Sequence, residues 1–183
     1  MKTRLSGVRE QSPRLFTFEM HQDDPSKCTS AKMRRLGFAR QISKGAIPRE
    51  SIVLNPGGVE PVSILDRPSA LKRGLVVIDC SWAHAQEVFR VHFKGVQRRL
   101  PGLLAGNPIN YSKLGALSSL EAMSGALYIM NFKDLSVKLL SIYKWGETFF
   151  TLNQDALNEY SNANSLEELK RIELEFFPNA QRS

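Results

Sequence analysis

The sequence predicts an α/β fold in which a mostly parallel sheet is followed by an all-helical part. In the first half, short apolar runs rich in Val, Ile and Leu alternate with turns and short helical stretches, which is typical of parallel strands joined by crossovers. Beyond about residue 98, apolar residues recur at helical spacing behind capping signals. With 183 residues, the chain can bury a core as one compact domain or as two small ones.

Strands are expected where apolar runs end at turn residues. The expected strands cover residues 14–19, 51–54, 62–65 and 74–79. A short helix is expected over 31–36, stopped at Gly37, and a second helical stretch over 83–90 directly after the last strand. We expect a flexible leader over 1–13, an α/β domain with a basic face over 14–98 and a helical domain over 99–183.

The helical part carries two capping boxes, in which a Ser is followed three residues later by a Glu. They are Ser118 with Glu121, and Ser165 with Glu168. The first opens an apolar stretch that runs to Met130. Asp134 is expected to cap a further helix that ends near Trp145 and Gly146, because Gly commonly terminates helices.

The net charge of +7 is concentrated in the first quarter of the chain. Residues 1–49 hold 11 Lys and Arg against 4 Asp and Glu, whereas residues 100–183 hold 7 against 9. A one-sided positive field attracts polyanions such as the phosphate backbone of RNA. The candidate phosphate contacts are Lys27, Lys32, Arg34 and Arg35. A basic face that is merely solvated is the alternative, and no zinc-finger or common RNA-binding motif decides between them.

Several classes of protein are disfavoured. No apolar run approaches the roughly 20 residues that cross a membrane, so no membrane partner is expected. Cys28 and Cys80 form no C-x-x-C pair and no metal-ligand cluster, so no metal is expected. A disulfide between them stays open, but reducing conditions and a cytoplasmic location are favoured. The even charge of the helical part offers no obvious dimer face, which favours a monomer.

Residues 78–82, Ile-Asp-Cys-Ser-Trp, follow a buried apolar strand. Ligands in open α/β sheets collect beyond the carboxyl ends of strands, so this block is a natural pocket wall. The alternative is an ordinary helix start in which Ser81 is the cap and Trp82 belongs to the core.

Residues 98–111 are too apolar for a solvent loop, yet their Pro and Gly residues forbid a long helix. Either a ligand such as a nucleoside or the protein itself must satisfy this buried backbone.

Three blocks of the sequence together resemble the ribosomal RNA aminocarboxypropyltransferase family. The blocks are 24–29 (DPSKCT), 78–82 (IDCSW) and 100–122, and residues 144–149 (KWGETF) with 152–153 (LN) extend the likeness. The resemblance implies transfer of the 3-amino-3-carboxypropyl group of S-adenosyl-L-methionine to N3 of a pseudouridine, often N1-methylated, in small-subunit rRNA during ribosome biogenesis. It also implies a SPOUT-like fold with a deep trefoil knot, in which 100–111 is knot backbone.

By position, the resemblance places S-adenosylmethionine against a set of residues from several parts of the chain. These are Thr29, Ile78, Leu100, Gly115 and Ser119. Leu100 and Gly115 would contribute backbone at the adenine, and several relatives have a bulky aromatic where this chain has Gly115. Relatives also tend to have Gly where this chain has Ser30.

The chemistry needs two further groups. Trp82 and Ala85, on one helix face, can form an apolar wall that keeps the sulfonium methyl away from the base and offers a cation–π contact. The nucleophilic ring nitrogen must lose a proton, and Asp79 is the candidate general base. A SPOUT RNA methyltransferase and a non-catalytic RNA-binding ribosome-assembly factor are the alternative functions.

Overall fold

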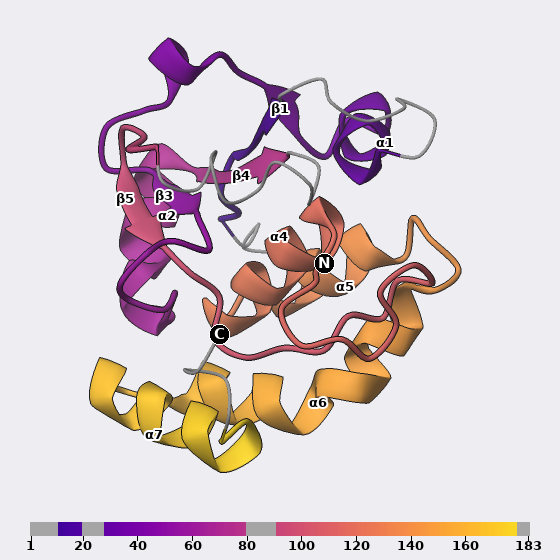
Figure 1. Cartoon of the computed structure of the whole chain (residues 1–183). Helices are drawn as coiled ribbons and strands as arrows, with labels where there is room; N and C mark the ends of the chain where they lie inside the picture. Colours follow the sequence, from indigo (N-terminus) through magenta and orange to yellow (C-terminus); the bar gives the residue numbers. More distant parts are fainter. Residues whose placement is uncertain (1–10, 20–27, 80–90, 179–183) are drawn as a thin grey trace, which may run out of the picture.

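The computed structural model describes residues 11–19, 28–79 and 91–178 (Figure 1). The strands are β1 (Leu15–Glu19), β2 (Arg40–Gln41), β3 (Ile52–Leu54), β4 (Leu75–Asp79) and β5 (Val96–Arg98). The α-helices are α1 (Thr29–Arg35), α2 (Arg67–Arg73), α4 (Ser119–Ile129), α5 (Lys133–Leu140), α6 (Gly146–Asn162) and α7 (Leu166–Phe176). Two 3-10 helices are η1 (Lys44–Ala46) and η2 (Ile64–Asp66). Residues 1–10 of the predicted leader lie outside the described residues, as do Lys27 and the predicted helix over 83–90, with Trp82 and Ala85.

The strands form a five-stranded sheet in the order β2-β1-β4-β3-β5, and every described pair is parallel. The prediction of a parallel sheet followed by helices is therefore confirmed. β1 and β4 pair along their whole length, from Leu15 opposite Leu75 to Glu19 opposite Asp79. Their carboxyl ends consequently lie side by side and place two acidic residues at the same edge of the sheet.

The strand predicted over 62–65 is wrong. Ser63 caps η2: its hydroxyl accepts a hydrogen bond from Leu65 N, and its own amide donates to Asp66 Oδ2. These local side-chain bonds compete successfully with a sheet ladder. The sequence analysis also missed β2 and β5, which are short and carry polar residues, so they lack the apolar pattern on which strand prediction depends.

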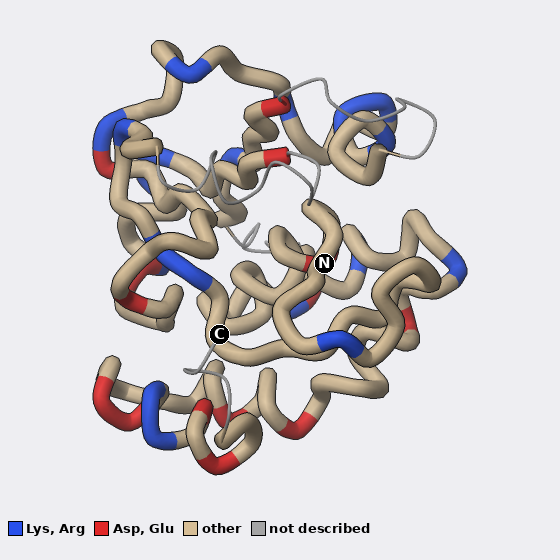
Figure 2. The backbone as a smooth tube through the Cα atoms, viewed as in Figure 1, with Lys and Arg blue, Asp and Glu red and all other residues tan. Residues whose placement is uncertain are grey.

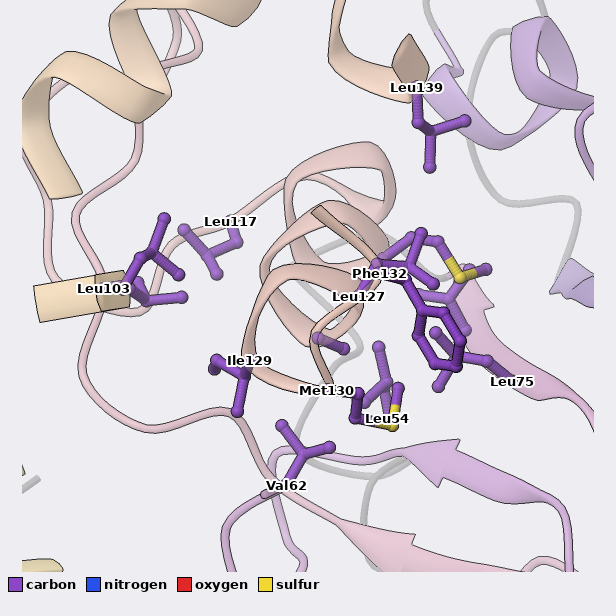
Figure 3. Close-up of a cluster of buried hydrophobic side chains, with 14 of the residues drawn as sticks. Leu54, Val62, Leu75, Leu103, Leu117, Leu127, Ile129, Met130, Phe132 and Leu139 are labelled. Atoms are coloured by element: carbon purple, nitrogen blue, oxygen red, sulfur yellow. The ribbon is translucent and has the colours of Figure 1, made fainter. Parts of the chain in front are cut away.

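The two faces of the sheet support two cores, because side chains alternate between faces along a strand. Leu75 and Val77 of β4 point to the helical layer, whereas Val76 and Ile78 belong to a smaller cluster with Phe93 on the opposite face. The larger cluster joins residues of the sheet to α4, α5 and the residues between them (Figure 3). This core crosses the domain boundary expected near residue 98.

The helix termini agree with the sequence in part. The Ser118–Glu121 capping box is present at the start of α4, and the Ser165 hydroxyl accepts from Glu168 N at the start of α7. Asp134 is not a cap: α5 begins one residue before it, and residues 145–146 begin α6 rather than end α5. Gly146 serves close packing there, since a Cβ at this position would lie 2.1 Å from the Leu140 carbonyl oxygen. None of the described helices combines the length and apolar character of a membrane span.

Candidate active site

Asp79 is the last residue of β4, and its side chain faces the helical layer. The alternation of the strand requires this direction, because Leu75 and Val77, four and two residues earlier, pack against the helices. The carboxylate therefore emerges at the carboxyl end of a parallel sheet, in the seam between sheet and helices, where α/β proteins bind ligands.

Three neutral side chains donate hydrogen bonds to the Asp79 carboxylate. The Ser119 hydroxyl, at the start of α4, donates to Oδ1, while the Cys28 thiol (2.9 Å) and the Ser30 hydroxyl (2.5 Å) donate to Oδ2. We refer to Cys28, Ser30, Asp79 and Ser119 as the Asp79 cluster. Thr29 adds a link, because its hydroxyl oxygen accepts from Leu120 N at 3.3 Å. The cluster thus joins the first turn of α1, the end of β4 and the first turn of α4.

The donors that the described residues supply leave the Asp79 carboxylate capacity for one more partner. An ionised carboxylate has about four lone-pair positions. Among the described residues, one donor occupies Oδ1 and two occupy Oδ2. A further proton or donor can therefore approach Oδ1. Such a carboxylate is held in one orientation and still available, as a general base requires.

Cys28 is held as a neutral thiol. It caps α1, with Sγ accepting from Ala31 N at 3.4 Å. Burial, followed by the hydrogen bond to Asp79, raises the pKa of the Cys28 thiol above its usual value. The protonated thiol is the form that donates to the carboxylate, so this cysteine stabilises the Asp79 cluster and is a poor nucleophile at neutral pH.

Sequence reasoning missed a second carboxylate at this edge. Glu19 ends β1 beside Asp79, its side chain is 7% exposed, and it is paired with Arg34 Nη1 at 2.9 Å. The Thr17 hydroxyl also donates to it at 3.2 Å. A signal was present, because both Glu19 and Asp79 terminate five-residue strands. The Arg34 guanidinium compensates the charge of Glu19, whereas no cationic partner of Asp79 is found among the described residues.

The irregular segment 99–118 obtains its hydrogen bonds from the protein. Buried Glu121 accepts from Gly106 N (2.7 Å) and Asn107 N (2.9 Å), and buried Asn153 accepts from Leu104 N at 2.7 Å. Glu173 of α7 accepts from Gly102 N at 2.8 Å. The sequence left open whether a ligand or the protein satisfies this backbone. For these N–H groups the protein does, as in a well-packed internal loop. The segment delivers the chain to Ser119 in a fixed position.

The residues expected around S-adenosylmethionine are brought together in part. Ser119 belongs to the Asp79 cluster, and Thr29 lies beside it. Ile78 precedes Asp79 in β4, and its side chain packs in the smaller hydrophobic cluster on the other face of the sheet. Leu100 is half-buried against the main core, and Gly115 is exposed at φ +73° with nothing within 4 Å of a Cβ placed on it. Both belong to the irregular segment that leads to Ser119.

The candidate RNA contacts lie in different environments. Arg35 is exposed, and no ion pair of it is found among the described residues. Arg34 pairs with Glu19, and Lys32 Nζ lies 3.8 Å from the centroid of the Tyr143 ring. Figure 2 shows Lys and Arg on α1 and on the neighbouring segments of the sheet layer, whereas Asp and Glu gather on α6 and α7.

Comparison with known proteins identifies the family. The family described as "Ribosome biogenesis protein, C-terminal" matches residues 52–177. A curated 16S rRNA aminocarboxypropyltransferase of Vulcanisaeta distributa is 45% identical over 152 residues, which cover 81% of this chain and 82% of that protein. The chain belongs to the 16S rRNA aminocarboxypropyltransferase family. The relative of the same name in Methanocaldococcus jannaschii is 41% identical over 165 residues, 90% of this chain and 96% of that protein.

The fold of this family member agrees with a solved relative. The structure of the SAM-dependent rRNA:acp-transferase of Vulcanisaeta distributa superimposes with a TM-score of 0.81 at 43% identity, covering 87% of this chain and 88% of that one.

Residues 13–45 also match a family described as a possible Fer4-like domain in RNase L inhibitor. Iron–sulfur clusters are usually held by four Cys thiolates, and this stretch contains only Cys28. We therefore take the second match as local sequence likeness.

Proposed function

We propose that this protein transfers the 3-amino-3-carboxypropyl group of S-adenosyl-L-methionine to N3 of a pseudouridine or N1-methylpseudouridine in small-subunit rRNA. This transfer would be the last step in making N1-methyl-N3-aminocarboxypropyl-pseudouridine during ribosome biogenesis. The observation that carries the proposal is the near full-length likeness, at 43% identity, to a SAM-dependent rRNA:acp-transferase. The Asp79 cluster at the edge of the sheet supports it.

The proposed reaction is a single displacement. The N3 atom of the base attacks the carbon of the aminocarboxypropyl chain that is bonded to sulfur, the carbon–sulfur bond breaks, and its electron pair stays on sulfur. The products are the N3-substituted base, methylthioadenosine and the proton that N3 lost. Because the sulfonium carries three carbons open to attack, positioning decides which one reacts.

Residues of the Asp79 cluster are suited to two parts of this reaction. A single donor from the described part of the chain occupies Oδ1 of Asp79, so this oxygen can take the N3 proton. Thr29 and Ser119 stand beside it with hydroxyls suited to the polar aminocarboxypropyl tail. We retain Ile78, Leu100 and Gly115 as contacts of the adenosine part, and Trp82 with Ala85 as the wall against the sulfonium methyl.

The rRNA is proposed to approach over the basic face of the α/β layer. Arg35 is its clearest phosphate contact, because it is exposed at the end of α1, whose first turn belongs to the Asp79 cluster. Phosphate contacts of this kind orient the substrate and are sequence-independent. We further propose a cytoplasmic, monomeric enzyme that acts on a pre-ribosomal subunit.

The finer description of the fold is also a proposal. We infer a SPOUT-like domain in which residues 100–111 are backbone of a deep trefoil knot. Its support is the parallel sheet and the way α4, α6 and α7 each supply a buried polar side chain to this segment. Such a path is against the usual rule that connections do not thread loops, so it has to be specified by tertiary contacts of this kind.

The test is nucleoside analysis of small-subunit rRNA. Purified protein is incubated with S-adenosylmethionine and rRNA from cells that lack the activity, and the digested nucleosides are analysed by mass spectrometry. An aminocarboxypropyl group on pseudouridine is the expected result. A methyl group would indicate a methyltransferase, and an unchanged nucleoside beside intact RNA binding would indicate an assembly factor. Either outcome would contradict the proposal.

A further inference from the structure

Helix α1 bridges the two layers of the molecule. On the sheet side, Arg34 Nη1 lies 3.0 and 2.9 Å from the two carboxylate oxygens of Glu19 and also donates to Gln41 of β2. On the helical side, Lys32 Nζ lies 3.8 Å from the centroid of the Tyr143 ring. Figure 1 shows α1 beside the end of β1. Two of the four cations expected to contact phosphate, Lys32 and Arg34, thus face partners within the protein.

α1 depends on such contacts because it is short. It has seven residues, of which Ser30 and Met33 are buried, and isolated helices of that length are not stable in water. Yet its first turn supplies the Cys28, Thr29 and Ser30 side chains that meet Asp79 and the start of α4. A small displacement of α1 would therefore separate these donors from the carboxylate.

The partner of Lys32 is itself fixed. Tyr143 stacks on Trp145 with ring centroids 5.0 Å apart and an interplanar angle of 30°, and both rings pack against the main core. Burial raises the pKa of Tyr143, so the ring stays a neutral phenol. An ammonium over such a ring is attracted by its quadrupole, and more strongly where water is partly excluded.

We propose that Lys32 and Arg34 are positioning residues, which hold α1 between the sheet and the Tyr143–Trp145 pair and thereby align the donors of the Asp79 cluster. The assignment rests on the proposed function in one respect, because its first test measures the affinity for S-adenosylmethionine. It differs from the expectation that both cations contact rRNA phosphates, and it leaves Arg35 as the phosphate contact on α1.

The principal test compares Lys32→Met with Lys32→Arg, which retains a cation over the ring. The matched control is Lys133→Met, because Lys133 makes the same kind of contact: its Nζ lies 4.9 Å from the Tyr128 ring. Tyr128 is nine residues after Ser119, or about 14 Å along α4, so this contact is remote from the Asp79 cluster. Calorimetry should give an S-adenosylmethionine Kd raised by about 3- to 30-fold in Lys32→Met, restored largely in Lys32→Arg and unchanged in Lys133→Met. The affinity for rRNA and its salt dependence should stay at wild-type values.

Arg34 is tested in the same way with Arg34→Met, for which we expect a rise in the Kd of about 2- to 5-fold, since solvent at the guanidinium screens the ion pair. The Arg34 side chain is 40% exposed, although that of Glu19 is only 7% exposed. A fall in rRNA affinity and salt slope for Lys32→Met and Arg34→Met, with cofactor binding unchanged, would overturn the proposal and make both residues phosphate contacts.

Amide hydrogen exchange provides a readout that does not need the activity. Residues 29–35 should exchange faster in Lys32→Met than in the wild type, and at the wild-type rate in Lys133→Met. If the wild-type protein fails to bind S-adenosylmethionine, the proposed function fails, while exchange still decides the role of Lys32. Unchanged exchange in Lys32→Met would contradict the positioning role whatever the protein binds.

Discussion

Asp79, at the end of β4, and Glu121, in the first turn of α4, are two carboxylates that differ in how many of their acceptor positions are filled. Glu121 is fully buried and accepts five hydrogen bonds, from Gly106 N, Asn107 N and Nδ2, and Ser118 N and Oγ. Its acceptor positions are filled, and it fixes the irregular segment to α4. Asp79 is half-buried and, among the described residues, accepts three bonds, all from neutral side chains. The difference indicates a structural role for Glu121, and for Asp79 it leads us to expect a chemical role.

The largest expected effect separates these roles at Asp79. Asp79→Asn keeps the shape of the side chain, and the hydroxyls around it can rotate to accept from the new amide. We expect transfer to fall by about 10²–10⁴-fold, as is typical of general-base removal, with S-adenosylmethionine affinity and melting temperature near wild type. Single-turnover transfer and calorimetry measure both. If affinity and stability fall together with transfer, Asp79 only shapes the pocket, and full transfer would eliminate its role as base.

The reverse result is expected at Glu121. Glu121→Gln turns an amide NH2 group toward buried N–H donors, and each buried group left without a partner costs about 1–3 kcal/mol. We expect the free energy of unfolding to fall by about 2–4 kcal/mol, measured by urea denaturation. Glu168→Gln is the matched control, because Glu168 follows Ser165 at the start of α7 and accepts from Asn164 N in a more exposed site. A loss there as large as at Glu121 would contradict the distinction.

Substrate binding should be separable from both carboxylates through Arg35. Removing one phosphate contact with Arg35→Met should reduce the salt slope of rRNA binding by about 1 and leave cofactor affinity unchanged. Arg171→Met, at an exposed position of the acidic helix α7, is the control. An unaltered slope for Arg35→Met would mean that this arginine belongs to a solvated face.

The smallest effect concerns the reactivity of Cys28. Because burial and the bond to Asp79 raise the pKa of this thiol, the thiolate fraction at pH 8 should be below that of a free cysteine, and alkylation by iodoacetamide correspondingly slow. The measurement uses a Cys80→Ser background. In Asp79→Asn the second cause is removed, so alkylation should accelerate. Equal rates in the two proteins would mean that Asp79 does not accept from this thiol.

Local patterns predicted the parts of this site that lie within one segment. The apolar run that ends in an acid identified Asp79 and its strand, and Ser118 with Glu121 identified the start of α4. Thr29 and Ser119 came from the resemblance rather than from any pattern. The prediction failed over 62–65, where Ser63 forms a local cap that an apolar pattern does not reveal.

Contacts between distant segments could not be predicted. Lys32 and Tyr143 meet across 111 positions of the chain, Cys28 and Asp79 across 51 and Arg99 and Glu173 across 74. A basic residue in sequence gives no sign of whether it faces phosphate, a carboxylate or a ring. These contacts decide whether a cation belongs to the RNA surface or to the support of the Asp79 cluster.

The central claim is tested most directly by labelling S-adenosylmethionine twice, with one isotope in the methyl group and another in the carboxyl group, and following both in a reaction with small-subunit rRNA. The account predicts that the carboxyl label enters the rRNA while the methyl label leaves as methylthioadenosine, in equal molar amounts. Methyl label in the rRNA, or methylthioadenosine released without carboxyl label in the rRNA, would contradict it.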